Sequence, residues 1–332
     1  MATLAATHPT LLDVTKRLDP NGKIDSIVEM LSLNNEMLDD MVWVEGNLPT
    51  GHRTTIRSGI PAPTWRKIYG GVQPNKSTTV QVTDSCGMLE AYAEVDKALA
   101  DLNGNTAAFR LSEERAFIEG INQEVQSSLI YASEATAPEE ITGLGPRFNS
   151  LSAENGGNII VDATGNTSIW LVVWGPNTVH GIYPKGSVGG LQMTDKGQVT
   201  LEDASGGSNT GRMEAYRTHY RWDCGLSVRD WRYVVRAQID YSALLATVAT
   251  GGDLVDIMTQ MLELLPTGGL GMGRPAFYMN RSIRSMLRRQ MVTQVKNSTL
   301  SLNEIAGKQV LSFDGVPVRR VDGIHFSETT IT

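Results

Sequence analysis

The stretch LSEERAFIEGINQEVQSSLIYAS, residues 111–133, has the strongest helical pattern in the chain. Apolar side chains recur every four residues along it and therefore share one helix face: Phe117, Ile121, Val125 and Leu129. Ser112 is suited to cap the helix, with acidic residues following in the first turn. Gly120 in the middle should cost about 1 kcal/mol relative to alanine. We therefore expect either a close approach to another element or a slight bend at this glycine.

Before this helix, the segment from Asn47 to about Val95 consists of short extended runs separated by glycine and proline. The runs HRTTIRS, TWRKIY and STTVQVTD are rich in threonine, valine, isoleucine and aromatic residues, which predicts a long β-hairpin. Its first half holds few large apolar residues, and an isolated two-stranded ribbon is only marginally stable in water. The hairpin should therefore lie on another surface, either the body of the same chain or a neighbouring subunit.

Beyond residue 150, strands alternate with connections and helices, which together with the long helix predicts an α+β fold. SIWLVVWG, residues 168–175, is a nearly continuous apolar run of the kind found in strands buried on both faces. The glycine-rich residues 181–209 indicate an exposed excursion. Further expected elements are two strands in 212–240, an amphipathic helix in 253–265, a strand in 275–280 and a closing hairpin in 308–324 that turns at Asp314 and Gly315.

Charge is unevenly distributed along the chain, which has 29 basic and 36 acidic residues and a net charge of -7. Residues 46–83 hold five basic residues and no acid, and residues 264–303 hold six basic residues and no acid. The remainder carries 18 basic residues against all 36 acidic ones, so the chain is electrically complementary to copies of itself. Each exposed pair contributes roughly 0–1 kcal/mol, but many repeated pairs can fix orientation. The alternative is that both blocks are ordinary solvated surface.

MNRSIRSMLRRQM, residues 279–291, predicts a second amphipathic helix that begins after an N-cap at Asn280. Its apolar residues share one side, and Arg281, Arg284 and Arg288 share the opposite side. Three interpretations follow: contact with an acidic surface of another subunit, a plain surface helix, or DNA binding. We rank them in that order. The acidic remainder of the chain can supply the facing surface, whereas no aromatic residues are interleaved with the arginines and no helix-turn-helix partner lies next to the segment.

Motifs typical of catalysis or of metal and cofactor binding are missing from the sequence. The five histidines form no HxH or HExxH pair, the two cysteines form no CxxC, and no GxSxG elbow occurs. We therefore predict that the protein is no enzyme and binds no cofactor or metal; an enzyme with a site built from distant residues is the alternative. Without a signal-peptide pattern or an 18-residue apolar run, the chain should be soluble, cytosolic and free of membrane contact.

The order of these parts resembles the major capsid proteins of tailed double-stranded-DNA phages, particularly short-tailed phages, which share the Hong Kong 97-type fold. The amino-acid sequences of several stretches are also similar to that family, and these stretches cover most of the chain. Residues 48–84 resemble its E-loop, 109–131 and 138–151 its spine helix and helix exit, and 168–191 and 225–240 its body. Ala132 departs from the glycine expected at the helix exit.

The resemblance implies an α+β, Hong Kong 97-like capsid fold with four parts. These are an N-terminal arm (1–47), an extended β E-loop (48–88), a peripheral domain (89–150) with the spine helix at 112–133, and a last part (151–332) with the axial domain and remaining peripheral strands. The implied function is that of a virion structural protein. It would self-assemble into hexamers and pentamers of an icosahedral shell around phage double-stranded DNA. The alternative function is a nucleic-acid-associated protein that uses the Arg281–Arg289 helix face.

The resemblance also implies which residues lie at subunit interfaces. On the E-loop, reaching across a neighbouring subunit, these are Arg53, Arg57, Trp65, Arg66, Lys67 and Lys76. On the second amphipathic helix they are Arg281, Arg284 and Arg288. No partner for a lysine–asparagine cross-link can be identified, so we expect none. Expected partners are other copies of the chain, a decoration or cement protein, a portal, a separate scaffolding protein if any, and packaged DNA in non-specific proximity. Assembly should take place in the host bacterial cytoplasm.

Overall fold

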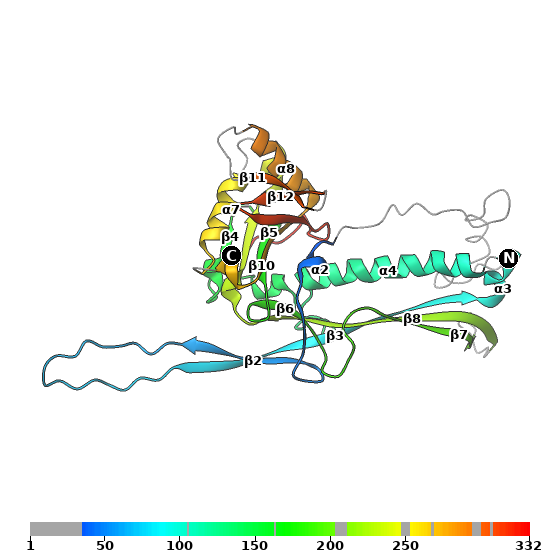
Figure 1. The fold of residues 1–332 in the computed structure, drawn as a ribbon, viewed down its shortest axis with the longest axis horizontal. Helices are drawn as coiled ribbons and strands as arrows, with labels where there is room; N and C mark the ends of the chain where they lie inside the picture. Colours follow the sequence, from blue (N-terminus) through cyan, green and yellow to red (C-terminus); the bar gives the residue numbers. More distant parts are fainter. Residues whose placement is uncertain are drawn as a thin grey trace. The chain divides into compact units, whose positions relative to one another are not determined.

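The computed structural model describes residues 35–332, apart from 105, 163, 203–210, 247–252, 267–268, 294–299 and 306–307. Most of the expected N-terminal arm therefore lies outside the described residues. The chain forms two compact units (Figure 1). The first contains Met88–Val125 and Val188–Asp223; the second contains Asn34–Gly87, Gln126–Ser187 and Cys224–Thr332. This grouping differs from the expected division, because residues 126–150 group with the second unit.

The first unit combines a long helix with antiparallel strands. Strand β7 (Gln192–Glu202) pairs with β8 (Arg212–Val228) in a register from Gln192 opposite Arg221 to Glu202 opposite Arg212. Most residues of β7 are exposed, as expected for residues 181–209, but the sequence did not predict that they form a paired strand. Strand β3 (Thr78–Asp96) ends at Asp96, whose side chain caps the short helix α3 (Lys97–Ala100). Val95, Ala100 and Phe109 form a small buried cluster beside them.

Helix α4 (Thr106–Tyr131) is the long helix predicted from the sequence, but it begins six residues before Ser112. Ser112 therefore lies inside the helix, and its hydroxyl donates to the carbonyl of Phe109 at 2.8 Å instead of capping the first turn. The helix continues through Gly120. A Cβ atom placed at Gly120 would meet nothing within 4 Å. No element of the described chain thus makes the close approach expected at this glycine.

The second unit is built around strand β5 (Thr167–Trp174), in which all eight residues are buried, as the sequence predicted. β5 pairs antiparallel with β9 (Val234–Ile239) and β10 (Arg274–Met279), and parallel with β6 (Val179–Tyr183). On the far side of β10, the sheet continues through β13 (Val316–Arg320), β12 (Lys308–Phe313) and β11 (Leu300–Ile305). Short strands β1 (Trp43–Glu45) and β4 (Ile159–Val161) pair with β6 and β9.

Two helices cover this sheet with apolar side chains. Helix α7 (Leu254–Glu263), capped by Asp253, buries Met258 and Met261, and helix α8 (Arg281–Thr293) buries Ile283 and Leu287. Asn280 caps α8 as predicted, since its Oδ1 accepts from the Ser282 amide at 3.1 Å. The remaining helices of the unit are short: α2 (Met37–Asp40), α5 (Leu144–Arg147) and α6 (Tyr241–Ala246). The mixture of helices and strands confirms the α+β class.

The closing hairpin turns at Asp314 and Gly315, as predicted. Both residues have positive φ angles, 47° and 80°, which is the geometry of the tight hairpin turn favoured by Asp-Gly. Within the described residues, no helix is long and apolar enough to span a membrane.

Candidate assembly surface on the β2–β3 hairpin

The second unit also carries the predicted hairpin, formed by β2 (Gly51–Gly59) and the first part of β3. Their antiparallel register runs from Gly51 opposite Ser85 to Gly59 opposite Thr78, with a bulge near Ser58. At the base, Asp84 is almost fully buried, accepts from the Ser227 hydroxyl at 2.7 Å and lies 2.9 Å from the Arg147 guanidinium. A buried carboxylate is tolerated only with such partners. These contacts attach the base of the hairpin firmly to its unit.

Two histidines pack beside this base. The rings of His52 and His180 meet edge to face with centroids 5.6 Å apart, and His180 is completely buried. Burial, together with smaller effects of the nearby His52 and Arg229 in the same direction, lowers the pKa of His180 to about 4. Burial also lowers the pKa of His52. Both rings are therefore neutral at pH 7, which allows them to pack against each other next to Arg229.

The tip of the hairpin, residues 60–77, continues past the paired parts of β2 and β3 (Figure 1). Two local hydrogen bonds shape it: Asn75 Nδ2 donates to the Ala62 carbonyl at 2.8 Å, and the Gly70 amide donates to the Lys67 carbonyl at 3.0 Å. Tyr69 has a φ of 63°, an uncommon backbone conformation for a bulky residue.

Four large apolar side chains of the tip are at least 80% exposed, and Val72 is 52% exposed. Trp65 and Tyr69 are fully exposed, and Ile60 and Ile68 are 85% and 80% exposed. Single exposed apolar residues are ordinary, but a group on one segment marks a contact surface. Among these four, the sequence pointed only to Trp65. The aromatic and isoleucine content of an acid-free segment was the available signal for the others.

The predicted basic residues lie along the same hairpin, with Arg53 and Arg57 on β2 and Arg66, Lys67 and Lys76 on the tip. Arg57, Arg66, Lys67 and Lys76 are exposed, and in the part of the chain that the structure describes no carboxylate lies within 4.0 Å of their charged groups. Arg53 is also exposed, and its Nε donates to Thr83 Oγ1 at 3.1 Å. The hairpin therefore presents positive charge and apolar surface together.

Three of the four arginines of α8 were predicted at an interface, and these three do not share one environment. Arg281 and Arg288 are exposed, whereas Arg284 is partly buried and lies 4.0 Å from Glu36 Oε1 of the same chain. Burial lowers the pKa of Arg284; Glu36 acts in the opposite direction, and the positive Arg288, Arg320 and Arg319 lower the pKa further. Arg284 thus faces an acid of its own chain. The contact of this face with another copy stays a prediction, and Arg281 and Arg288 are its two exposed members.

Within the described residues, no three histidine, cysteine, aspartate or glutamate side chains are placed to hold a metal ion.

Comparison with known proteins gives a consistent result. A family model described as major capsid protein GP7 matches residues 19–332. A chain from the near-atomic cryo-EM structure of bacteriophage Epsilon15 is 36% identical, with 100% of this chain and 99% of that chain covered and a TM-score of 0.79. No curated protein matches.

Two more distant matches come from bacteriophage JBD30. One is its capsid decorated with minor capsid protein trimers, at 10% identity, with 91% of this chain and 96% of that chain covered and a TM-score of 0.46. The other is its capsid, at 9% identity, with 89% and 93% covered and a TM-score of 0.44.

Proposed function

This chain belongs to the major capsid protein GP7 family, and we propose that its β2–β3 hairpin is the segment that joins neighbouring subunits in the shell. It is a structural protein with the Hong Kong 97-like fold, and its function is to form the icosahedral capsid of a bacteriophage. The observation that carries the proposal is the hairpin tip. In the described chain, its large apolar side chains are exposed, and no carboxylate lies within 4.0 Å of its cationic groups.

Burial of the tip supplies the energy for this contact. An aromatic side chain buries roughly 150–250 Å², and at about 25 cal/mol per Å² this gives at most about 4–6 kcal/mol for Trp65 or Tyr69. Part of that gain offsets the lost freedom of the associating subunits. The basic residues contribute orientation and rate of association more than affinity, because they lie at an exposed surface. Repetition of the contact around each capsomer makes the shell stable.

The wider assembly follows the same proposal. Subunits form hexamers and pentamers in the host bacterial cytoplasm, and the closed shell encloses double-stranded DNA without sequence-specific contacts. A net charge of -7 suits a container, since a strongly basic wall would bind the genome tightly and hinder its release. A decoration or cement protein, a portal and a separate scaffolding protein are the further partners we propose.

Nucleic-acid binding by α8, the alternative function, is not favoured. Arg284 lies against Glu36, which removes one of the three arginines from the exposed face. The comparisons identify a shell protein instead.

Charge reversal on the hairpin tests the proposed role. We expect Arg57→Glu and Arg66→Glu to reduce the yield of shells or capsomer rings, measured by negative-stain microscopy and sedimentation, while circular dichroism shows folded subunits. Arg212→Glu is the matched control, because Arg212 is exposed on β8 outside the hairpin. Normal shells from both hairpin variants would count against the proposed role of this segment.

A further inference from the structure

The base of the hairpin is held in place through one of its two histidines. His52 Nδ1 accepts a hydrogen bond from the Asn47 amide at 3.3 Å, so this nitrogen carries no proton. The Asn47 side chain returns to β2, where its Oδ1 accepts from the Arg53 amide and its Nδ2 donates to the Arg53 carbonyl, both at 2.7 Å. These bonds fix the segment at which the chain enters the hairpin.

The second histidine, His180 of β6, packs against His52 from the sheet side. It is completely buried, and its ring centroid lies 5.6 Å from that of His52. Neither of its ring nitrogens makes a hydrogen bond of normal geometry with the described residues. The backbone of Gly175 gives a charged ring only weak support. A proton taken up by this ring would therefore be poorly stabilised where the ring now lies.

The charged groups around the two rings also oppose protonation. Arg229, which follows β8, disfavours a charge on either ring. Its Nη1 donates to the Pro176 carbonyl and to Asn177 Oδ1, both at 3.1 Å, so the guanidinium is held beside the rings. Each ring would also repel the other if both were charged.

Asp84 of β3 is the carboxylate that favours a charge on both rings, and it lies directly opposite His52 in the β2–β3 register. It is already engaged, however, by the Arg147 guanidinium of α5 at 2.9 Å and by the Ser227 hydroxyl of β8 at 2.7 Å. On the neighbouring strand β1, Glu45 accepts from a backbone amide on the far side, that of Gly186, at 2.9 Å. The acids near the base are therefore committed to other partners.

We propose that His52 and His180 form a proton-operated lock on the hairpin. At neutral pH the lock holds the base of the hairpin against β6; in acid the base separates from β6, and subunits stop assembling until the pH is raised again. A proton on His52 Nδ1 ends its bond to the Asn47 amide, and a charge on either ring lies beside Arg229. The inference rests on the proposed role of the hairpin and goes beyond it by naming what regulates it.

The size of the effect follows from the linkage between protons and the released state. The pKa of His180 is about 4 in the closed base and about 6.5 once the ring is exposed to water. The released state therefore binds more protons between these values, so the lock is complete above pH 6.5 and weakens as the pH falls. At pH 5 the equilibrium shifts about 30-fold toward release from this ring alone.

Amide hydrogen exchange of dispersed full-length subunits tests the lock directly. After correction for the intrinsic pH dependence of exchange, we expect the amides of β2 to exchange at least tenfold faster at pH 5 than at pH 7. The amides of β5, a buried strand of the same unit without histidine, should change less than twofold. In parallel, the yield of shells and capsomers in sedimentation should fall at least fivefold at pH 5 and recover at pH 7.

Variants assign the effect to the two rings. His52→Gln keeps an acceptor for the Asn47 amide but does not titrate, and it should reduce the acid effect on β2 exchange at least threefold. His52→Gln combined with His180→Gln should abolish the effect. His325→Gln, at an exposed position of the same unit, should keep it in full. Circular dichroism at pH 7 verifies folding, and His52→Gln alone decides if the double variant does not fold.

The proposal is wrong if β2 exchange in the unmodified chain does not accelerate in acid, or if His52→Gln responds to acid like His325→Gln. Release of β2 at pH 5 with a normal yield of shells would also overturn it, because the lock would then not control assembly. The proposed role of the hairpin fails separately, through normal shells from the charge-reversed hairpin variants at pH 7.

Discussion

The sheet core and the hairpin tip, both in the second unit, use the same kinds of residue in opposite surroundings. In the core, Trp174 Nε1 donates to the Tyr278 hydroxyl at 2.7 Å, and this hydroxyl donates to Asp40 at 3.0 Å. Asp40 in turn lies 2.7 Å from the Arg319 guanidinium. At the tip, Trp65 and Tyr69 are fully exposed. Aromatic and charged groups stabilise the subunit in the sheet core, whereas at the hairpin tip they remain available for contact with a partner.

This difference separates folding from assembly. The core aromatic groups are buried and their polar atoms have partners, so their loss reduces the stability of each subunit. The tip contributes little to that stability, because an exposed side chain gains nothing from burial until a partner covers it. Substitutions in the two regions should therefore have effects that can be measured independently.

The largest expected effect is in the core. Phe277 is fully buried and packs edge to face against Phe313, with ring centroids 6.0 Å apart. Phe277→Ala should lower the free energy of unfolding by about 3–5 kcal/mol, measured by urea denaturation of dispersed subunits. Phe277→Leu, which keeps most of the apolar volume, should lose clearly less. A loss below about 1 kcal/mol for the alanine variant would contradict the view that this sheet carries the stability of the unit.

The next effect concerns the histidines at the base of the hairpin. The pKa of His180 is about 4 in the folded chain and about 6.5 when unfolded. The unfolded chain therefore binds more protons between these values, so stability is complete above pH 6.5 and falls as the pH drops toward 4. The full loss is about 3 kcal/mol. Unfolding measured in steps from pH 7.5 to 4 should show this decline.

Two variants separate this contribution from other titrating groups. His180→Gln should flatten the pH dependence, whereas His325→Gln should keep it, because His325 is exposed. Equal pH dependence in both variants would show that the buried ring is not responsible. Arg229 and Asp84 also influence His180, with opposite signs, so both must remain unchanged in the comparison.

Local sequence patterns predicted many elements of the fold. The apolar run of β5, the Asp314–Gly315 turn and the Asn280 cap each depend on neighbouring residues, and the structure confirms all three. The predicted start of α4 was wrong, because a serine can either cap a helix or lie inside one. Ser112 lies inside the helix, where its hydroxyl donates to the Phe109 carbonyl. Strand β7 was missed because its regular structure comes from pairing with β8, a partner that its own glycine-rich sequence does not reveal.

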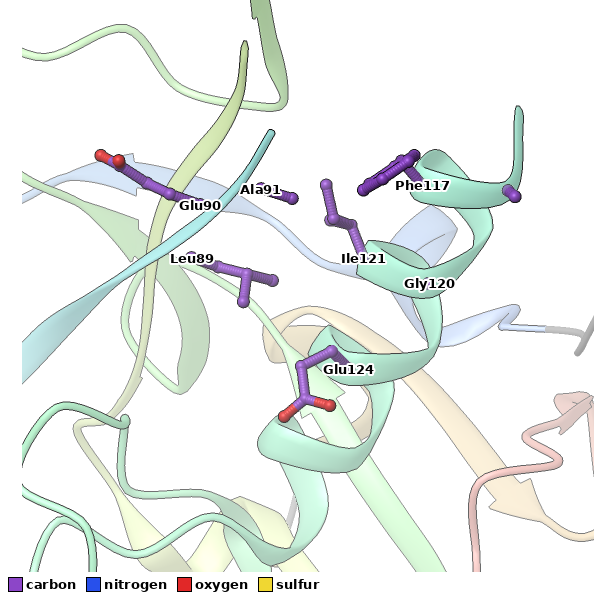
Figure 2. A pocket seen from close by; sticks show the side chains of 8 residues that line it. Leu89, Glu90, Ala91, Phe117, Gly120, Ile121 and Glu124 are labelled. Carbon is purple, nitrogen blue, oxygen red and sulfur yellow. The ribbon is translucent and has the colours of Figure 1, made fainter. Parts of the chain in front are cut away.

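Only part of the candidate site could be predicted from the sequence. The acid-free composition pointed to the hairpin cations, since charge can be counted along the chain without a structure. The contact of Arg284 with Glu36 joins residues far apart in the sequence and could not be predicted. A groove in the first unit, between β3 and α4 with Gly120 in its lining (Figure 2), likewise depends on how these two elements pack; the sequence indicated only that this glycine needed an explanation.

The smallest expected effect on subunit stability, at the hairpin tip, is the sharpest test of the comparison. Trp65→Ala removes a fully exposed side chain, so the free energy of unfolding of dispersed subunits should change by no more than about 0.5 kcal/mol. The yield of assembled particles in sedimentation should nevertheless fall strongly, because the buried area at each contact is lost. Leu151→Ala, at another exposed apolar position of the second unit, should change neither quantity. A loss of more than about 1 kcal/mol for Trp65→Ala would mean that the tip packs against its own subunit, and the separation of folding from assembly would then fail.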